Sequence, residues 1–115
     1  MPDFIIYHNP RCSKSRQALE ILKDKGIQPE IIQYLDTPLN EEQLIDLVSK
    51  LNGPASQLVR TKEDDFKNSP FNLDDTETVI KELAKNPNLL ERPVVIHLNK
   101  AIVGRPPEKI MEFFH

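Results

Sequence analysis

The 115-residue sequence is poor in several residue types, and each shortage excludes a class of protein. Cys12 is the one cysteine, so no internal disulfide can form and a reducing compartment is expected. No apolar run approaches the ~20 residues of a membrane-spanning helix, and no basic-then-apolar signal pattern opens the chain. A formal net charge of −3 argues against general nucleic-acid binding, for which a basic face is expected. We therefore expect a cytoplasmic protein with a single domain over residues 1–115, and no membrane or nucleic-acid partner.

The sequence also lacks the spacing of several common active sites. One cysteine and three dispersed histidines do not form a zinc-binding pattern, so neither a metal nor a bound cofactor is expected. A dithiol oxidoreductase would need a second cysteine where Ser15 stands, and a low-molecular-weight phosphatase loop would need arginine where Ala18 stands. The three glycines are isolated, which excludes the Gly-rich phosphate-binding loops.

The segment from Phe4 to Arg16 carries the strongest signal of chemistry. A short strand-like run ends at the turn-forming pair Asn9-Pro10, and Cys12 follows just before a helix-like pattern for which Ser13 is the expected N-cap. A thiol at a helix N-terminus lies beside unpaired backbone N–H groups and the positive end of the helix dipole, which lower its pKa. Four basic or titratable residues lie within four positions of the sulfur: His8, Arg11, Lys14 and Arg16.

The alternative for Cys12 is an inert core residue, which is the usual fate of a free cysteine. A buried core thiol is not expected to have four basic or titratable neighbours, or to be preceded by Pro10-Arg11. Those features are typical of a solvated loop that attracts anions. We interpret the segment as an active-site loop.

Hydrophobic periodicity predicts an α/β protein. Strand-like segments at 3–7 and 29–35 flank one helix, so they form a βαβ unit with parallel strands. Helical patterns fill a helical insertion over about residues 40–87, with a capping box at Asn40 and Gln43, although Thr61–Asn72 is expected to be irregular. A hairpin of 93–98 and 101–103 and a last helix from Pro107 follow. This order, βαβ then ββα, predicts a thioredoxin-like mixed β-sheet with the insertion between its second and third strands.

Arginine is sparse and placed at breaks in the pattern. Two arginines flank Cys12, while Arg60, Arg92 and Arg105 each end a regular segment. The planar guanidinium group suits a bidentate grip on a carboxylate or oxyanion better than lysine does. The alternative is that these five residues fall near loops by chance.

Four segments in order resemble the glutaredoxin-dependent arsenate reductase family in its short form. The segments are Tyr7-His8-Asn9-Pro10-x-Cys12-x-x-Ser15-Arg16, Leu58-Val59-Arg60, Glu91-Arg92-Pro93-Val94-Val95 and Gly104-Arg105-Pro106. The resemblance covers nearly the whole chain, from Ile5 to Ile110. It implies an enzyme that reduces arsenate to arsenite, with glutathione as co-substrate and glutaredoxin as the second thiol donor.

The resemblance also implies a role for each site residue. Cys12 is the nucleophile that attacks arsenic as a thiolate, and His8 helps to keep it deprotonated. Ser15 hydrogen-bonds near the sulfur or the anion. The oxyanion is bound by three arginines: Arg60, Arg92 and Arg105. Pro93 is expected to follow a cis peptide bond that faces the cysteine, as thioredoxin-like folds place it.

A second interpretation is a binding protein. Spx-type transcription regulators resemble the same fold and loop but contact RNA polymerase without turnover. Their well-known redox-switch members carry Cys-x-x-Cys, which Ser15 excludes here. The three arginines also favour the enzyme over the regulator.

Overall fold

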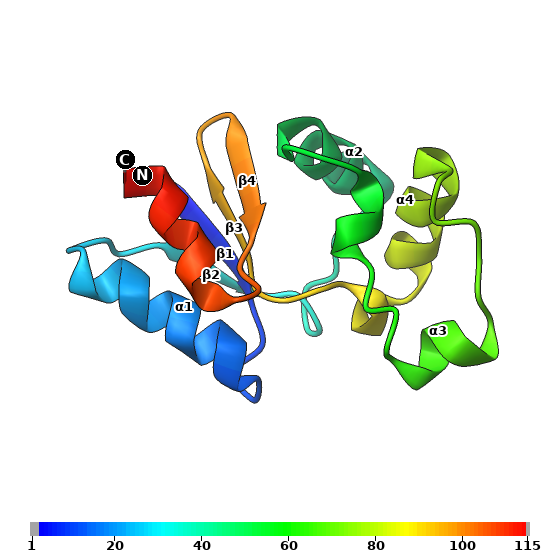
Figure 1. Ribbon diagram of the computed structural model, residues 1–115, viewed down its shortest axis with the longest axis horizontal. Coiled ribbons are helices and arrows are strands. Elements are labelled where there is room, and N and C mark those ends of the chain that lie inside the picture. Colours follow the sequence, from blue (N-terminus) through cyan, green and yellow to red (C-terminus); the bar gives the residue numbers. More distant parts are fainter. Residues whose placement is uncertain (1–2, 115) are drawn as a thin grey trace.

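The computed structural model describes residues 3–114 and has a mixed sheet with helices on both sides (Figure 1). Along the chain the elements are β1 (Phe4–His8), α1 (Ser13–Asp24), β2 (Glu30–Gln33), α2 (Glu41–Lys50), the 3₁₀ helix η1 (Ala55–Leu58), α3 (Asp64–Asn68), α4 (Thr76–Lys85), the 3₁₀ helix η2 (Pro87–Leu89), β3 (Val94–His97), β4 (Lys100–Val103) and the 3₁₀ helix η3 (Pro107–Phe114). Among these residues no helix is both long and apolar enough to cross a membrane.

The four strands lie in the order β2-β1-β3-β4. β1 and β2 are parallel, with His8 opposite Gln33, so both strands leave the sheet at the same edge. β1 pairs with β3 and β3 with β4 in antiparallel fashion, and Val94 lies opposite Val103. The predicted parallel βαβ unit and the predicted hairpin are both confirmed.

Side chains alternate between the two faces of the sheet, as the two-residue period of a strand requires. Phe4 and Ile6 of β1, with Val95 and Ile102 of the hairpin, face α1 and η3 and form one buried cluster with them. Figure 1 shows α1 and the C-terminal η3 together on this side of the sheet. α1 contributes Leu22, which is fully buried.

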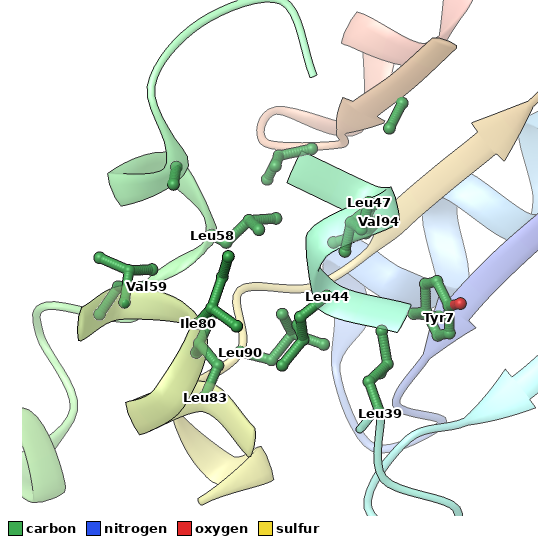
Figure 2. Close-up of a cluster of buried hydrophobic side chains, with 14 of the residues drawn as sticks. Tyr7, Leu39, Leu44, Leu47, Leu58, Val59, Ile80, Leu83, Leu90 and Val94 are labelled. Atoms are coloured by element: carbon green, nitrogen blue, oxygen red, sulfur yellow. The ribbon is translucent and has the colours of Figure 1, made fainter. Parts of the chain in front are cut away.

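The opposite face carries the larger cluster and joins the helical insertion to the sheet. Tyr7 and Val94 of the sheet pack in it with Leu44 and Leu47 of α2 (Figure 2). Behind them lie residues of the other helical segments, and Figure 2 shows Leu58, Ile80, Leu83 and Leu90 on the far side of α2 from the sheet. The insertion is therefore anchored through α2.

The sequence predicts the start of α2 correctly and misses α3. Asn40 and Gln43 form the expected capping box, with reciprocal hydrogen bonds of 2.8 and 2.9 Å. The segment Thr61–Asn72 was expected to be irregular, and this is wrong, because α3 forms within it. Two acidic residues begin α3 and Phe66 packs edge-on against Phe71 at 5.2 Å between ring centroids. Five residues are too few to produce a helical hydrophobic period.

Two neighbouring residues of α2 test the anchoring role of the helix. Leu44 is 1% exposed and Ile45 is 55% exposed. We expect Leu44→Ala to lower the free energy of unfolding by about 2–5 kcal/mol, because it removes buried methyl groups and leaves a cavity. Ile45→Ala should change it by less than about 1 kcal/mol. Urea unfolding followed by circular dichroism measures both, and equal effects would contradict this packing.

Candidate active site

The loop between β1 and α1 is held by its own backbone. The Cys12 N–H donates to the Asn9 carbonyl at 3.0 Å, and the Arg11 N–H donates to Asn9 Oδ1 at 3.0 Å. Cys12 is itself the N-cap of α1, in an extended conformation with φ −93° and ψ 122°, and its carbonyl accepts the Arg16 N–H at 3.0 Å. The prediction that Ser13 caps this helix is therefore wrong by one residue. The thiol occupies the place of a capping oxygen.

The environment of the Cys12 sulfur favours the thiolate. Burial of the sulfur raises its pKa, but other groups outweigh burial, so the pKa lies below its ordinary value. The largest of them is the backbone N–H of Ser15, followed by the Arg92 charge and the backbone N–H of Lys14. The N–H groups of Ser15 and Lys14 act on the sulfur, although Cys12 Sγ does not form a regular N-cap hydrogen bond with the helix. A helix end and a distant arginine thus act together on one thiol.

His8 contacts Ser15. Its Nδ1 lies 2.6 Å from Ser15 Oγ, which also accepts the Asn9 N–H at 3.1 Å, and both side chains are buried. Burial, and after it the charges of Arg16 and Lys23, lowers the pKa of His8, so the imidazole is neutral at neutral pH. Through Ser15, His8 fixes the loop that presents Cys12. Its expected effect on the thiol stays a prediction.

Backbone pairing brings the three distant arginines together. Arg92 precedes β3 and Arg105 follows β4 at the paired ends of the hairpin, where Arg105 Nη1 donates to the Arg92 carbonyl at 3.1 Å. The Arg60 N–H donates to the Leu89 carbonyl at 2.8 Å, and the Glu91 N–H bonds the Leu58 carbonyl. Residues 58–60 therefore lie beside residues 89–91, directly before Arg92.

The three guanidinium groups line one cavity. Its volume is about 230 Å³ and its lining residues are Arg60, Thr61, Lys62, Glu63, Glu91, Arg92 and Arg105. Cys12 is not among the residues that line this cavity, but Arg92 lines it and its charge also acts on the Cys12 sulfur. Arg92 Nε is buried and has no hydrogen-bond partner within residues 3–114. A buried donor without a partner costs about 1–3 kcal/mol, so a ligand that accepts from it is favoured.

Two of the arginines have carboxylate partners. Arg60 Nη2 lies 3.0 Å from Glu63 Oε2, and Arg60 Nη1 donates to the Asn88 carbonyl at 3.0 Å. Arg105 Nη1 lies 3.6 Å from Glu91 Oε1. These partners hold Arg60 firmly and Arg105 more loosely. Arg92 is the arginine that both lines the cavity and acts on the Cys12 sulfur.

Pro93 lies between Arg92 and the sheet, and the expected cis bond Arg92-Pro93 is confirmed. The Gly104 N–H donates to the Pro93 carbonyl at 2.8 Å. A Cβ at Gly104 would lie 3.0 Å from Pro93 Cγ and 3.4 Å from Ile110 Cγ2, so this close approach favours glycine. The glycine keeps the ends of β3 and β4 close together, and with them Arg92 and Arg105.

Tyr34 belongs to the site, and the sequence analysis missed it. It is 1% exposed, and burial raises the pKa of its phenol while the charges of Arg92 and Arg60 and the Asn9 side chain lower it. Tyr34 follows β2 as Asn9 follows β1, and these parallel strands end at the same edge. The predicted parallel pairing was a signal that could have found it.

The site residues include no metal centre. Over residues 3–114, no group of three or more His, Cys, Asp or Glu side chains is arranged to hold a metal ion. The arrangement offers a thiol with a lowered pKa and a cavity lined by three arginines, with Arg92 common to both. Cationic donors of this kind suit a tetrahedral oxyanion.

Comparisons with known proteins identify the family of the chain. The model of the ArsC family matches residues 7–113. A protein of Escherichia coli (strain K12) described as uncharacterized, YfgD, is 46% identical, with 93% of this chain and 92% of that protein covered. An arsenate reductase of Neisseria meningitidis (serogroup A / serotype 4A) is 44% identical, with 96% and 97% covered. The solved structure of an arsenate reductase from Vibrio cholerae superposes with a TM-score of 0.87 at 36% identity, with 96% and 97% covered. The resemblance and the thioredoxin-like fold expected from the sequence are confirmed, and the chain belongs to the ArsC family.

Proposed function

We propose that this protein is an arsenate reductase in which Cys12 is the single catalytic thiol and glutathione and glutaredoxin supply the electrons. The observation that carries the proposal is the convergence of Arg60, Arg92 and Arg105 on one cavity, with Arg92 acting on both the cavity and the sulfur. The names of its relatives support arsenate as the oxyanion.

The first step forms a bond between sulfur and arsenic. The Cys12 thiolate attacks arsenic, one arsenate oxygen takes up protons and leaves as water, and arsenic stays in the +5 state. The arginines hold the remaining oxygens, whose negative charge they offset with charge-assisted hydrogen bonds. Arg92 Nε has no hydrogen-bond partner within the described residues, and this supports its role as a donor to an arsenate oxygen.

The reduction needs two thiols besides Cys12, since the chain has no second cysteine. Glutathione sulfur displaces a second oxygen of the adduct as water. The glutaredoxin thiolate then attacks the glutathione sulfur, and the electron pair of the sulfur–arsenic bond stays on arsenic. Arsenic is thereby reduced to +3 while glutathione and glutaredoxin are oxidised to a mixed disulfide. Water splits the remaining bond, releasing arsenite and restoring Cys12.

Cys12→Ser should stay folded and lose arsenate reduction, because a hydroxyl is a far weaker nucleophile at neutral pH. The assay contains arsenate, glutathione, glutaredoxin, glutathione reductase and NADPH, and follows NADPH consumption. Omitting glutaredoxin from the wild-type reaction should also stop turnover. Activity of the serine variant within tenfold of the wild type would remove Cys12 from the mechanism.

Lysine in place of Arg60, Arg92 or Arg105 keeps the charge but loses the planar fork. We expect each of these variants to lower kcat/KM for arsenate about tenfold or more, which corresponds to about 1.4 kcal/mol. Arg11→Lys is the matched control, because the Arg11 side chain is exposed and does not line the cavity. Equal rates for all four variants and the wild type would refute the oxyanion role of the arginines.

Arg92→Ala should raise the pKa of Cys12, since it removes a positive charge that stabilises the thiolate. The rate of alkylation by iodoacetamide, measured from pH 5 to 10, should then shift to higher pH. Arg105→Ala is the control, because Arg105 is not among the groups that act on the sulfur. If both profiles match that of the wild type, the helix N-terminus alone sets the pKa.

A further inference from the structure

The cavity that holds the three arginines also contains two carboxylates, Glu63 and Glu91. Each carboxylate weakens the attraction of the cavity for any anion. A site selected for affinity alone would contain neither. The contacts of the two residues differ, and this difference assigns them different tasks.

Glu63 is fully engaged with its neighbours. Its Oε2 lies 3.0 Å from Arg60 Nη2, and its Oε1 accepts from Asn88 Nδ2 at 3.1 Å. Asn88 in turn accepts from Arg60 Nη1, through its carbonyl at 3.0 Å and its Oδ1 at 3.3 Å. These contacts close a ring of three residues, so Glu63 serves to hold the Arg60 fork in place.

Glu91 uses one oxygen. Its Oε1 accepts from the Arg92 N–H at 3.2 Å and lies 3.6 Å from Arg105 Nη1, which is beyond normal hydrogen-bond length. Both contacts of its side chain within residues 3–114 involve Oε1. Glu91 also lines the cavity, so we expect Oε2 to be available to a ligand there. The side chain is 21% exposed, so its charge is only partly screened by water.

We propose that Glu91 makes the cavity select tetrahedral oxyanions that carry a proton over those that carry none. Arsenate and phosphate keep at least one proton at neutral pH, whereas sulfate keeps none. A protonated oxygen can donate to Glu91 while the other oxygens accept from the guanidinium groups. Sulfate would place a lone pair against the carboxylate, with repulsion in place of a hydrogen bond.

The size of this discrimination depends on the cost of leaving a charged group without its hydrogen bond. A site that hydrogen-bonds one ligand rejects an isostere lacking the donor strongly, because its own polar group is left unpaired. Glu91 is partly exposed, so the effect is smaller than in a sealed pocket, roughly tenfold or more. The inference rests on the proposed function in taking this cavity as the oxyanion site.

Binding of inorganic phosphate and of sulfate to the full chain tests the proposal. Isothermal titration at about pH 8 and constant ionic strength needs no glutathione, glutaredoxin or turnover. At this pH phosphate is mainly the singly protonated dianion, so it carries the same charge as sulfate. We expect the wild type to bind phosphate roughly tenfold or more tightly than sulfate. Glu91→Gln should reduce this ratio about tenfold, mainly by a gain in sulfate affinity, because the amide can donate to sulfate.

Glu63→Gln is the matched control, because it removes one negative charge from the same cavity. A general electrostatic effect would raise the affinity of both anions in both variants and leave their ratio unchanged. We expect the phosphate-to-sulfate ratio of Glu63→Gln to stay within about twofold of the wild type. An equal change of the ratio in the two variants would overturn the role of Glu91.

The remaining outcomes separate this inference from the reductase activity. If the wild type binds phosphate and sulfate equally, or binds neither, the inference is overturned. If arsenate is reduced and sulfate competes as well as phosphate, the reductase proposal stands and the selectivity proposal fails. If phosphate is preferred and arsenate is not reduced, the selectivity stands and the reductase proposal fails.

Discussion

Repulsion among three guanidinium groups around one cavity is the constraint on which the rest of the site depends. Like charges about 4 Å apart near a protein surface repel by roughly 4 kcal/mol at an effective dielectric constant of about 20. The fold opposes this repulsion by backbone pairing, which places Arg60 beside the segment leading to Arg92 and joins Arg92 to Arg105 across the hairpin. Glu63 and Glu91 offset part of the charge. The rest of the charge is available to an anion.

The thiol depends on the same arrangement. The amides of α1 come from the residues that follow Cys12, whereas Arg92 comes from the start of β3, eighty positions along the chain. The local contribution needs nothing but the turn at Asn9-Pro10 and the start of α1. The distant contribution exists only when the sheet is formed, because β1 and β3 are neighbours in it. Folding and the lowering of the Cys12 pKa are therefore coupled.

Local patterns predicted much of this structure. Short runs of apolar and β-branched residues located the strands, and the capping box at Asn40 located α2. The order of segments led to the parallel pairing of β1 with β2. α3 was missed, because five residues show no period. The convergence of the three arginines was predicted from the resemblance to a family and not from local patterns. Tertiary packing sets the pairing of residues 58–60 with residues 89–91, and a local pattern does not show it. The contacts of Glu63 and Glu91 are likewise visible only in the folded chain.

The pairing of residues 58–60 with residues 89–91 also has a thermodynamic consequence. Val59 and Leu90 form an isolated bridge there, at the junction between the helical insertion and the sheet. An anion among the three guanidinium groups would contact both sides of that junction and bind the folded chain alone. Occupancy and unfolding are then linked: an oxyanion at 100 times its Kd would add about 2.7 kcal/mol to the free energy of unfolding. The concentration of the ligand would thus help to set the fraction of the protein that is folded.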